Sequence, residues 1–167
     1  VVLVGAPMPF AGVLAKQIRE SGWNVAIGAT GDFVTTDFGQ FLGPAANGLI
    51  MTDTGHYKCA LKRKVGKPWV TAWQKQFHRP PGANEIAGAD AIGVIAAAIR
   101  KARSTDGQKM VDALHRMSYN GIRFAEQWDA KGNLKHTPIP IVVWAKNGTQ
   151  LNNVMCDVQP VVHLKKP

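Results

Sequence analysis

Residues 1–22 read VVLVGAPMPFAGVLAKQIRESG, and this stretch decides the fold. Four apolar residues open it, as expected of a parallel strand that is covered on both faces. Pro9 fits the first turn of a helix, where its missing N–H is not needed. The helix that follows is amphipathic, with apolar residues at helical spacing: Phe10, Val13, Leu14 and Ile18. Gly22 suits the left-handed residue that ends a helix. The chain is therefore predicted to open in the middle of an α/β sheet.

A second strand is predicted at Val25-Ala26-Ile27. In α/β sheets of this class, ligands bind at the carboxyl ends of the strands. The candidate binding positions therefore lie in the turns that follow the two strands, at residues 5–8 and 28–33.

The composition is that of an ordinary folded protein. The chain has 167 residues, of which 46% are hydrophobic and 19% charged, which fits one domain or two small lobes rather than a disordered chain. No apolar run approaches the ~18 residues of a membrane span. The formal net charge is +9, and the densest basic run is 58–67. That run has no RNA- or DNA-binding signature, so we interpret it as a solvated loop and expect no nucleic-acid partner.

Two cysteines, Cys59 and Cys156, lie far apart and match no metal-binding spacing. An oxidising compartment would allow them to pair, but the sequence leaves the paired and the free state open. Position 1 is not methionine, and the predicted opening strand is an interior one. We therefore expect a processed or partial chain.

Helices and strands are predicted along the rest of the chain. The helices fall at residues 37–42, 68–77, 87–103 and 107–117, and the short strands at 48–51, 122–124, 139–144 and 150–156. Two of the helices carry large apolar residues at spacings of three and four: Trp69, Trp73 and Phe77 on one, and Ile92, Ile95 and Ile99 on the other. Pro140 indicates an edge strand or a bulge, and Asn147-Gly148 is typical of a tight hairpin.

No motif typical of an enzyme is present in the sequence. The histidines form no HxH or HExxH pair, and each is interpreted as a surface or loop residue: His56, His78, His115, His136 and His163. A GxSxG motif is absent, and the glycine-rich run at 28–31 is neither a phosphate-binding loop nor GxGxxG. We therefore expect a non-enzyme, without catalytic residues, metal or cofactor. One alternative stays open, because residues 1–6 also suit the start of a Rossmann-type NAD(P)-dependent oxidoreductase.

Four segments share their order and spacing with a known family. They are VVLVGAPMPFAGVLAKQIRESG at 1–22, GPAANGLIM at 43–51, GADAIGVIAAAIRKARSTDGQKMVDALHRM at 88–117 and GIRFAEQWDAKGNLKHTPIPIVVWAKNG at 121–148. Together they resemble the type I periplasmic binding proteins, and within them the branched-chain amino acid (Leu/Ile/Val) group of ABC-transporter receptors. The resemblance covers about the C-terminal half of a family member.

This resemblance implies an α/β fold of two Rossmann-like lobes that are joined by hinge crossovers and clamp a ligand between them. Residues 1–51 and 134–161 would then belong to the second, C-terminal lobe. Residues 52–133 would form part of the first lobe with the hinge crossing. The chain is expected to be incomplete, because the opening strands of the first lobe have no counterpart in it.

The resemblance also implies which residues contact the ligand. In the turn after the opening strand these are Ala6, Pro7 and Met8, where amino-acid receptors usually have an aromatic residue. On the first lobe, a helix that often begins Tyr-Asp has Ala89 in place of the tyrosine.

The turn after the second strand often carries an acidic residue that pairs with the ammonium group of the ligand. That position falls at or near Thr30, with Asp32 and Phe33 close by. The departures from the family pattern at Met8, Thr30 and Ala89 weaken the case for an α-amino acid ligand. An aromatic or short aliphatic carboxylate is therefore expected as a second ligand class. Packing at Met8 and Phe33, turn chemistry at Thr30 and a helix N-terminal role for Asp32 stay open.

The function implied by the resemblance is binding without catalysis. Hinge closure would bury the ligand, and an ABC permease at the inner membrane would accept the closed form. The protein is accordingly expected in the periplasm. The alternatives are the oxidoreductase fragment and a sensory ligand-binding domain with the same bilobed fold.

Overall fold

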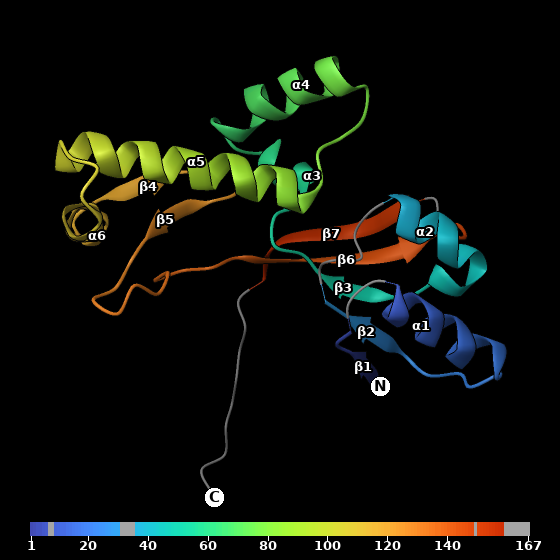
Figure 1. Ribbon diagram of the computed structural model, residues 1–167. Helices are drawn as coiled ribbons and strands as arrows, with labels where there is room; N and C mark the ends of the chain where they lie inside the picture. The colour runs from blue at the N-terminus through green and yellow to red at the C-terminus, as the bar shows by residue number, and fades with distance from the viewer. Residues whose placement is uncertain (7–8, 31–35, 149, 159–167) are drawn as a thin grey trace, which may run out of the picture.

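The computed structural model describes residues 1–6, 9–30, 36–148 and 150–158. These residues form two regions, which Figure 1 shows side by side. The sheet region contains the described residues of 1–52 and 139–158, and the helical region contains 57–127. Two crossing segments, 53–56 and 128–138, connect the regions.

The sheet region contains a five-stranded sheet in the order β1-β2-β3-β6-β7. The strands are β1 (Val2–Val4), β2 (Ile27–Ala29), β3 (Ile50–Thr52), β6 (Ile139–Ala145) and β7 (Gln150–Val158). The first three are parallel, whereas β6 and β7 are each antiparallel to their neighbours. Parallel neighbours need crossover connections. These contain α1 (Phe10–Glu20) and α2 (Thr36–Leu42), the latter followed by the 3-10 helix η2 (Gly43–Ala46).

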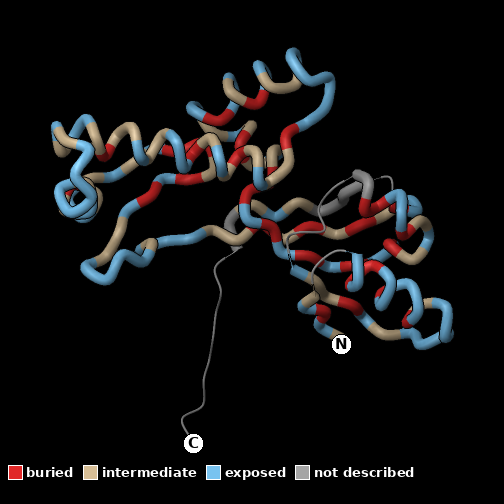
Figure 2. Tube along the Cα trace, in the orientation of Figure 1, coloured by how far each residue is buried: buried red, intermediate tan, exposed pale blue. Residues whose placement is uncertain are grey.

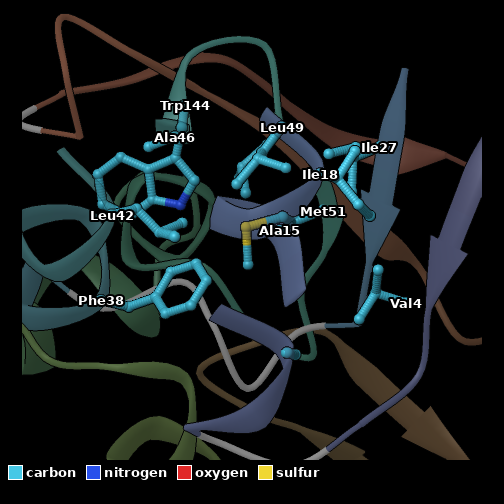
Figure 3. Close-up of a cluster of buried hydrophobic side chains, with 12 residues drawn as sticks. Val4, Ala15, Ile18, Ile27, Phe38, Leu42, Ala46, Leu49, Met51 and Trp144 are labelled. Carbon is cyan, nitrogen blue, oxygen red and sulfur yellow. The ribbon is translucent and has the colours of Figure 1, made fainter. Parts of the chain in front are cut away.

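One face of this sheet carries the main hydrophobic core. Val4 pairs in register with Ala29, Ala29 with Met51, and Met51 with Val142, so these residues form one row across the strands. Side chains from α1 and α2 close over this row (Figure 3). The buried cluster contains Val4, Ala11, Ala15, Ile18, Ile27, Phe38, Leu42, Ala46, Leu49, Met51, Val142 and Trp144.

The opposite face of the sheet is largely bare among the described residues. Leu3 and Ile50 both lie in register with Gly28 on that face, and they are 83% and 45% exposed. In addition, β1 lies at the edge of the described sheet. The prediction of an interior strand covered on both faces is therefore wrong for the described residues. The reason is that α1 and α2 both pack on the face that carries Val4.

Of the large apolar residues that were expected to face the core from α1, only Ile18 is buried. The buried residues of this helix are Ala11, Gly12, Ala15 and Ile18. By contrast, Phe10, Val13 and Leu14 are 69%, 41% and 43% exposed. A Cβ at Gly12 would lie 3.0 Å from the ring of Phe41 and 3.1 Å from that of Phe38. The close approach of α1 to α2 therefore selects the small residues. The predicted left-handed Gly22, with φ 74°, is confirmed.

The helical region is built from short and long helices beside a small hairpin. Its elements are α3 (Tyr57–Ala60), α4 (Gly66–Phe77), α5 (Ala83–Ala102), α6 (Gly107–His115), β4 (Ser118–Asn120) and β5 (Ala125–Gln127). Its buried apolar cluster is small: Ala60, Val70, Ile86 and Ile122. On α4, the predicted common face is confirmed, since the rings of Trp69 and Trp73 stack and the ring of Phe77 lies tilted against Trp73. On α5, however, Ile92 and Ile95 are 71% and 51% exposed, and Ile86 and Ala98 are buried instead.

Residues 122–124 form the connection between β4 and β5, not the predicted strand. The backbone N–H groups of Ile122 and Arg123 donate to the carboxylate of Asp90, at 2.6 and 3.0 Å. These donors are therefore used by a side chain of α5 instead of by a neighbouring strand.

The predicted features around β6 and β7 are confirmed. The pairing of the two strands shifts register on either side of Ile141, next to Pro140, as expected of a bulge. Asn147 and Gly148 have positive φ values of 55° and 79°, which a tight hairpin requires.

Candidate functional site

The candidate site lies at the carboxyl ends of β1, β2 and β3. Because these strands are parallel, their carboxyl ends meet at one edge of the sheet. Ala6 follows β1, Thr30 follows β2 and Asp53 follows β3. From Asp53 the chain crosses to α3, so this is also the edge at which the sheet region adjoins the helical region (Figure 1).

The predicted contact residues are distributed over both regions. Ala6 is half-buried against the sheet core, and Thr30 is exposed at the same edge. Ala89 lies on α5, where it is half-buried and packs against the core of the helical region. The structure therefore brings Ala6 and Thr30 to one edge and places Ala89 in the other region. The remaining predicted positions lie outside the described residues: Pro7, Met8, Asp32 and Phe33.

Asp53 begins the first crossing segment and was not predicted from the sequence. It is 3% exposed, and its Oδ1 accepts the N–H of Gly55 at 3.2 Å. Its own N–H donates to the carbonyl of Pro140 at 2.8 Å, which fixes the segment to β6. Burial raises the pKa of Asp53, and the hydrogen bonds from the Gly55 and Thr54 backbone act in the opposite direction.

His56 ends the same crossing segment and caps α3. Its Nδ1 accepts the N–H of Lys58 at 3.2 Å. The side chain is 3% exposed, so the expectation of a surface histidine is wrong for this residue, although it does lie between elements. Burial, with the nearby charge of Lys58, lowers the pKa of His56 to about 4. The ring is therefore neutral near pH 7, and Nδ1 stays available as an acceptor.

A buried charge network ties the crossing segment to the helical region. Arg123 Nε lies 3.2 Å from Asp90 Oδ2, and Arg123 Nη2 lies 3.2 Å from Glu126 Oε1. The Asp90 and Glu126 side chains are 1% and 6% exposed. Arg123 Nη1 reaches the carbonyl of Thr54 at 3.5 Å. A Cβ at Gly55 would lie only 2.7 Å from Arg123 Cδ, so the glycine is needed for this approach.

The network is electrostatically unbalanced, because one guanidinium faces two carboxylates. Burial raises the pKa of Glu126; the Arg123 charge opposes this shift, whereas the Asp90 charge adds to it. The sequence does contain one indication of a buried charge in this network. Asp90 is a charged residue among the apolar and small residues of α5, and a buried charge needs partners.

Cys59 and Cys156 form a disulfide, which settles the pairing that the sequence left open. The bond joins α3 to β7 across a sequence separation of 97 residues, with the Cα atoms 5.4 Å apart. It lines a small pocket together with both crossing segments and the β4–β5 connection. The lining residues are Thr54, Gly55, His56, Cys59, Arg123, Phe124, Pro138, Pro140 and Cys156.

Among the residues that the structure describes, no three His, Cys, Asp or Glu side chains gather as a metal ion would require. Within the same residues, no helix combines the length and the apolar character that crossing a membrane would take.

Comparison with known proteins places the chain in a family. A family model described as periplasmic binding protein matches residues 1–149. The chain belongs to this family. Its α/β architecture and the parallel strand ends at the junction of two regions agree with that assignment.

Similar periplasmic binding proteins include curated and solved examples. The chain is 24% identical over 149 residues to a leucine-, isoleucine-, valine-, threonine- and alanine-binding protein of Pseudomonas aeruginosa. A leucine-binding protein from Thermotoga maritima matches 92% of the chain with 24% identity and a TM-score of 0.80. A solute-binding protein from R. palustris, solved with benzoate, matches 93% of the chain with 14% identity and a TM-score of 0.68.

The chain spans less than half the length of these relatives. The match to the Pseudomonas protein includes 89% of the chain but only 39% of that protein. The matches to the two solved structures each include 43% of the solved chain. The structural matches show that the predicted fold, that of the type I periplasmic binding proteins, is the correct one.

Proposed function

We propose that this chain is part of an extracytoplasmic receptor of an ABC importer, and that the receptor binds a small amino acid or carboxylate between two lobes. The observation that carries the proposal is the meeting of three parallel strand ends at the edge where the chain crosses between regions. In open α/β sheets, ligands bind beside such ends. The family of the chain and the names of its relatives support the same role.

The two regions would correspond to the two lobes of the receptor. Residues 1–51 and 134–161 would form one lobe, and residues 52–133 would form part of the other. The separate cores of the sheet region and the helical region support this division. Binding across the junction would favour a closed state, because only closure brings both lobes onto the ligand. A permease in the inner membrane would then receive the ligand from the periplasm, with no catalytic step.

The ligand would contact the strand-end turns, through Ala6, Pro7, Met8, Thr30, Asp32 and Phe33, and the helical region near Ala89. Thr30 bears on the ligand's chemistry, because a hydroxyl there supplies no negative charge to pair with an ammonium group. Asp32 is the acidic residue of the same turn, and binding of leucine stronger than that of the matched acid would assign the ammonium group to it. Because Thr30 carries no charge, we infer that the ligand is held mainly by its carboxylate and apolar part. The relative solved with benzoate is compatible with such a ligand.

A thermal-shift panel tests this proposal with matched ligands. Leucine and 4-methylpentanoate differ by the ammonium group, benzoate supplies an aromatic acid, and NAD tests the oxidoreductase alternative. A ligand at a hundred times its dissociation constant stabilises a protein by about 2.7 kcal/mol. We expect 4-methylpentanoate or benzoate to raise the melting temperature at least as much as leucine does. The panel is run on the full-length protein that contains this chain. A shift with NAD alone, or no shift with leucine or with either acid, would then overturn the receptor assignment.

Thr30→Glu sharpens the test, because it places a carboxylate at the end of β2. We expect leucine binding to strengthen roughly tenfold, about 1.4 kcal/mol, and binding of 4-methylpentanoate to weaken. Gln17→Glu adds the same charge to an exposed position of α1 and should change neither ligand. Equal effects of the two variants would remove Thr30 from the site.

A further inference from the structure

We propose that the Cys59–Cys156 disulfide is a hinge tether, which fixes α3 to the sheet region and confines rotation between the two regions to the chain beyond Cys59. The first observation is the anchoring of the first crossing segment and of the helix after it. The start of the segment is held to β6 by the hydrogen bond from the Asp53 N–H to the Pro140 carbonyl, at 2.8 Å. The helix that directly follows the segment, α3, is held to β7 by the disulfide.

The segment and α3 are also held by the helical region. Ala60 is buried in the core of the helical region, and Tyr57 packs against that core. Arg123 contacts Thr54 and Gly55 from the β4–β5 connection. A rotation between the regions must therefore loosen one set of these contacts. The noncovalent contacts of the helical region can slide or exchange, whereas the covalent bond to β7 persists.

The disulfide restricts movement to a small range. Disulfide-bonded cysteines keep their Cα atoms within about 4.4–6.8 Å of each other, and the distance here is 5.4 Å. With the bond intact, α3 can therefore move relative to β7 by only about 1–2 Å at this point. The larger displacements of a hinge motion must therefore break contacts beyond Cys59, which include the packing of Ala60 and Leu61 in the helical core and the hydrogen bonds of Arg63 with Asn120 and Gly121.

The second crossing segment passes the same point. Pro138 and Pro140 line the pocket that the disulfide also lines. The tether therefore lies where both described connections between the regions meet, close to any axis about which they rotate. A link near that axis permits rotation and resists separation of the regions. Its importance for ligand closure rests on the proposed receptor function, but the restraint itself does not.

Amide hydrogen exchange tests the tether without any ligand. The intact protein is compared with the double variant Cys59→Ser/Cys156→Ser and with protein reduced by dithiothreitol, which becomes a cyclic disulfide as two thiols form. We expect exchange to accelerate at least tenfold at residues 54–60 and around 156, with little change at the centres of α5 and β3. Local opening of this kind is what exchange detects.

The control is Met51→Ala, which weakens the sheet core without touching the tether. It should accelerate amide exchange across the sheet region. The acceleration at residues 54–60 should be no larger than that in the sheet region. Unchanged exchange at 54–60 after loss of the disulfide would overturn the proposal, as would a uniform increase over the whole chain. Because no ligand is added, failure of the receptor assignment in the thermal-shift panel would leave this result unaffected.

Discussion

The buried cluster of the sheet region is large and apolar, whereas the helical region has a small apolar cluster and, in addition, buried charges. Figure 2 shows buried residues along the strands and inner helix faces of the first and at scattered points in the second. The buried charged residues of the helical region are Asp90 and Glu126, with Arg123 between them. The two regions therefore depend on different interactions.

This difference has a physical consequence. Apolar burial stabilises in proportion to area and tolerates changes of shape that preserve volume. A buried charge network is stabilising only while every member keeps its partner, because an unpaired buried charge is strongly unfavourable. We therefore expect the sheet region to respond to changes of volume and the helical region to changes of charge.

The largest effect is expected for Asp90→Ala. It leaves Arg123 without one of its two carboxylate partners and the N–H groups of Ile122 and Arg123 without an acceptor. Breaking a buried pair costs about 3–5 kcal/mol. Denaturant unfolding measures the loss, and amide exchange should locate it at α5 and the β4–β5 connection. Asp112→Ala, which removes a carboxylate that bonds Gln108 within α6, should cost less than about 0.5 kcal/mol. Similar losses for both variants would contradict the role of the network.

Met51→Ala tests the sheet region in the same way. Met51 is fully buried at the centre of the covered face. Removal of its side chain should cost about 2–5 kcal/mol, through lost transfer energy and a cavity. Leu3→Ala removes a similar side chain from the bare face, where Leu3 is 83% exposed. It should have an effect below about 0.5 kcal/mol. A large loss for Leu3→Ala would show that the bare face is covered in solution.

Acidification tests the junction between the regions. His56 has an ordinary pKa of 6.5 and a native pKa of about 4, so the unfolded chain binds more protons between these values. The stability contribution of neutral His56 is therefore complete above about pH 6.5 and decreases as the pH falls toward 4. From pH 7 to pH 5 the loss should be about 2 kcal/mol. Protonation would also remove the Nδ1 acceptor that caps α3.

Asp53 and Glu126 act in the opposite direction, because burial raises the pKa of each and the native protein takes up their protons first. The free energy of unfolding of the wild-type protein must therefore be compared, as a function of pH, with that of His56→Asn. Asparagine retains a capping acceptor and does not titrate. The difference between the two pH profiles isolates His56. Parallel profiles would show that the histidine is hydrated in the native state.

The smallest effect is expected for Ile92→Gln. Ile92 is 71% exposed on α5, so its substitution should change stability by less than about 0.5 kcal/mol. The same substitution at Ile86, which is fully buried, should destabilise the helical region severely. Denaturant unfolding of the two variants measures the contrast. A severe loss at Ile92 would mean that a partner surface covers α5 in solution.

Much of the fold could be predicted from local signals. The spacing of apolar residues placed the helices, and α6 begins at a residue typical of a cap, since Asp106 Oδ1 accepts the Lys109 N–H at 3.0 Å. Asn147-Gly148 specified the hairpin between β6 and β7. These signals succeed because the atoms involved lie within a few residues of one another. The strand-end site could be proposed for the same reason, since each turn directly follows its strand.

Other features depended on contacts that no local pattern contains. The face of α1 that is buried was decided by the rings of Phe38 and Phe41. The exposure of Leu3 was decided by the packing of both crossover helices on one side. The burial of His56, which does lie in a connection, was missed because nothing near it in sequence indicates burial.

The sequence by itself therefore determined the α/β class, the order of most elements and the likeness to periplasmic binding proteins, because these follow from periodicity and short motifs. The tertiary structure alone decided which faces are buried, which charges meet and which cysteines pair. Asp90 meets Arg123 across 33 residues, and Cys59 meets Cys156 across 97. Such pairs form only when the elements between them have folded, since their geometry depends on how those elements pack.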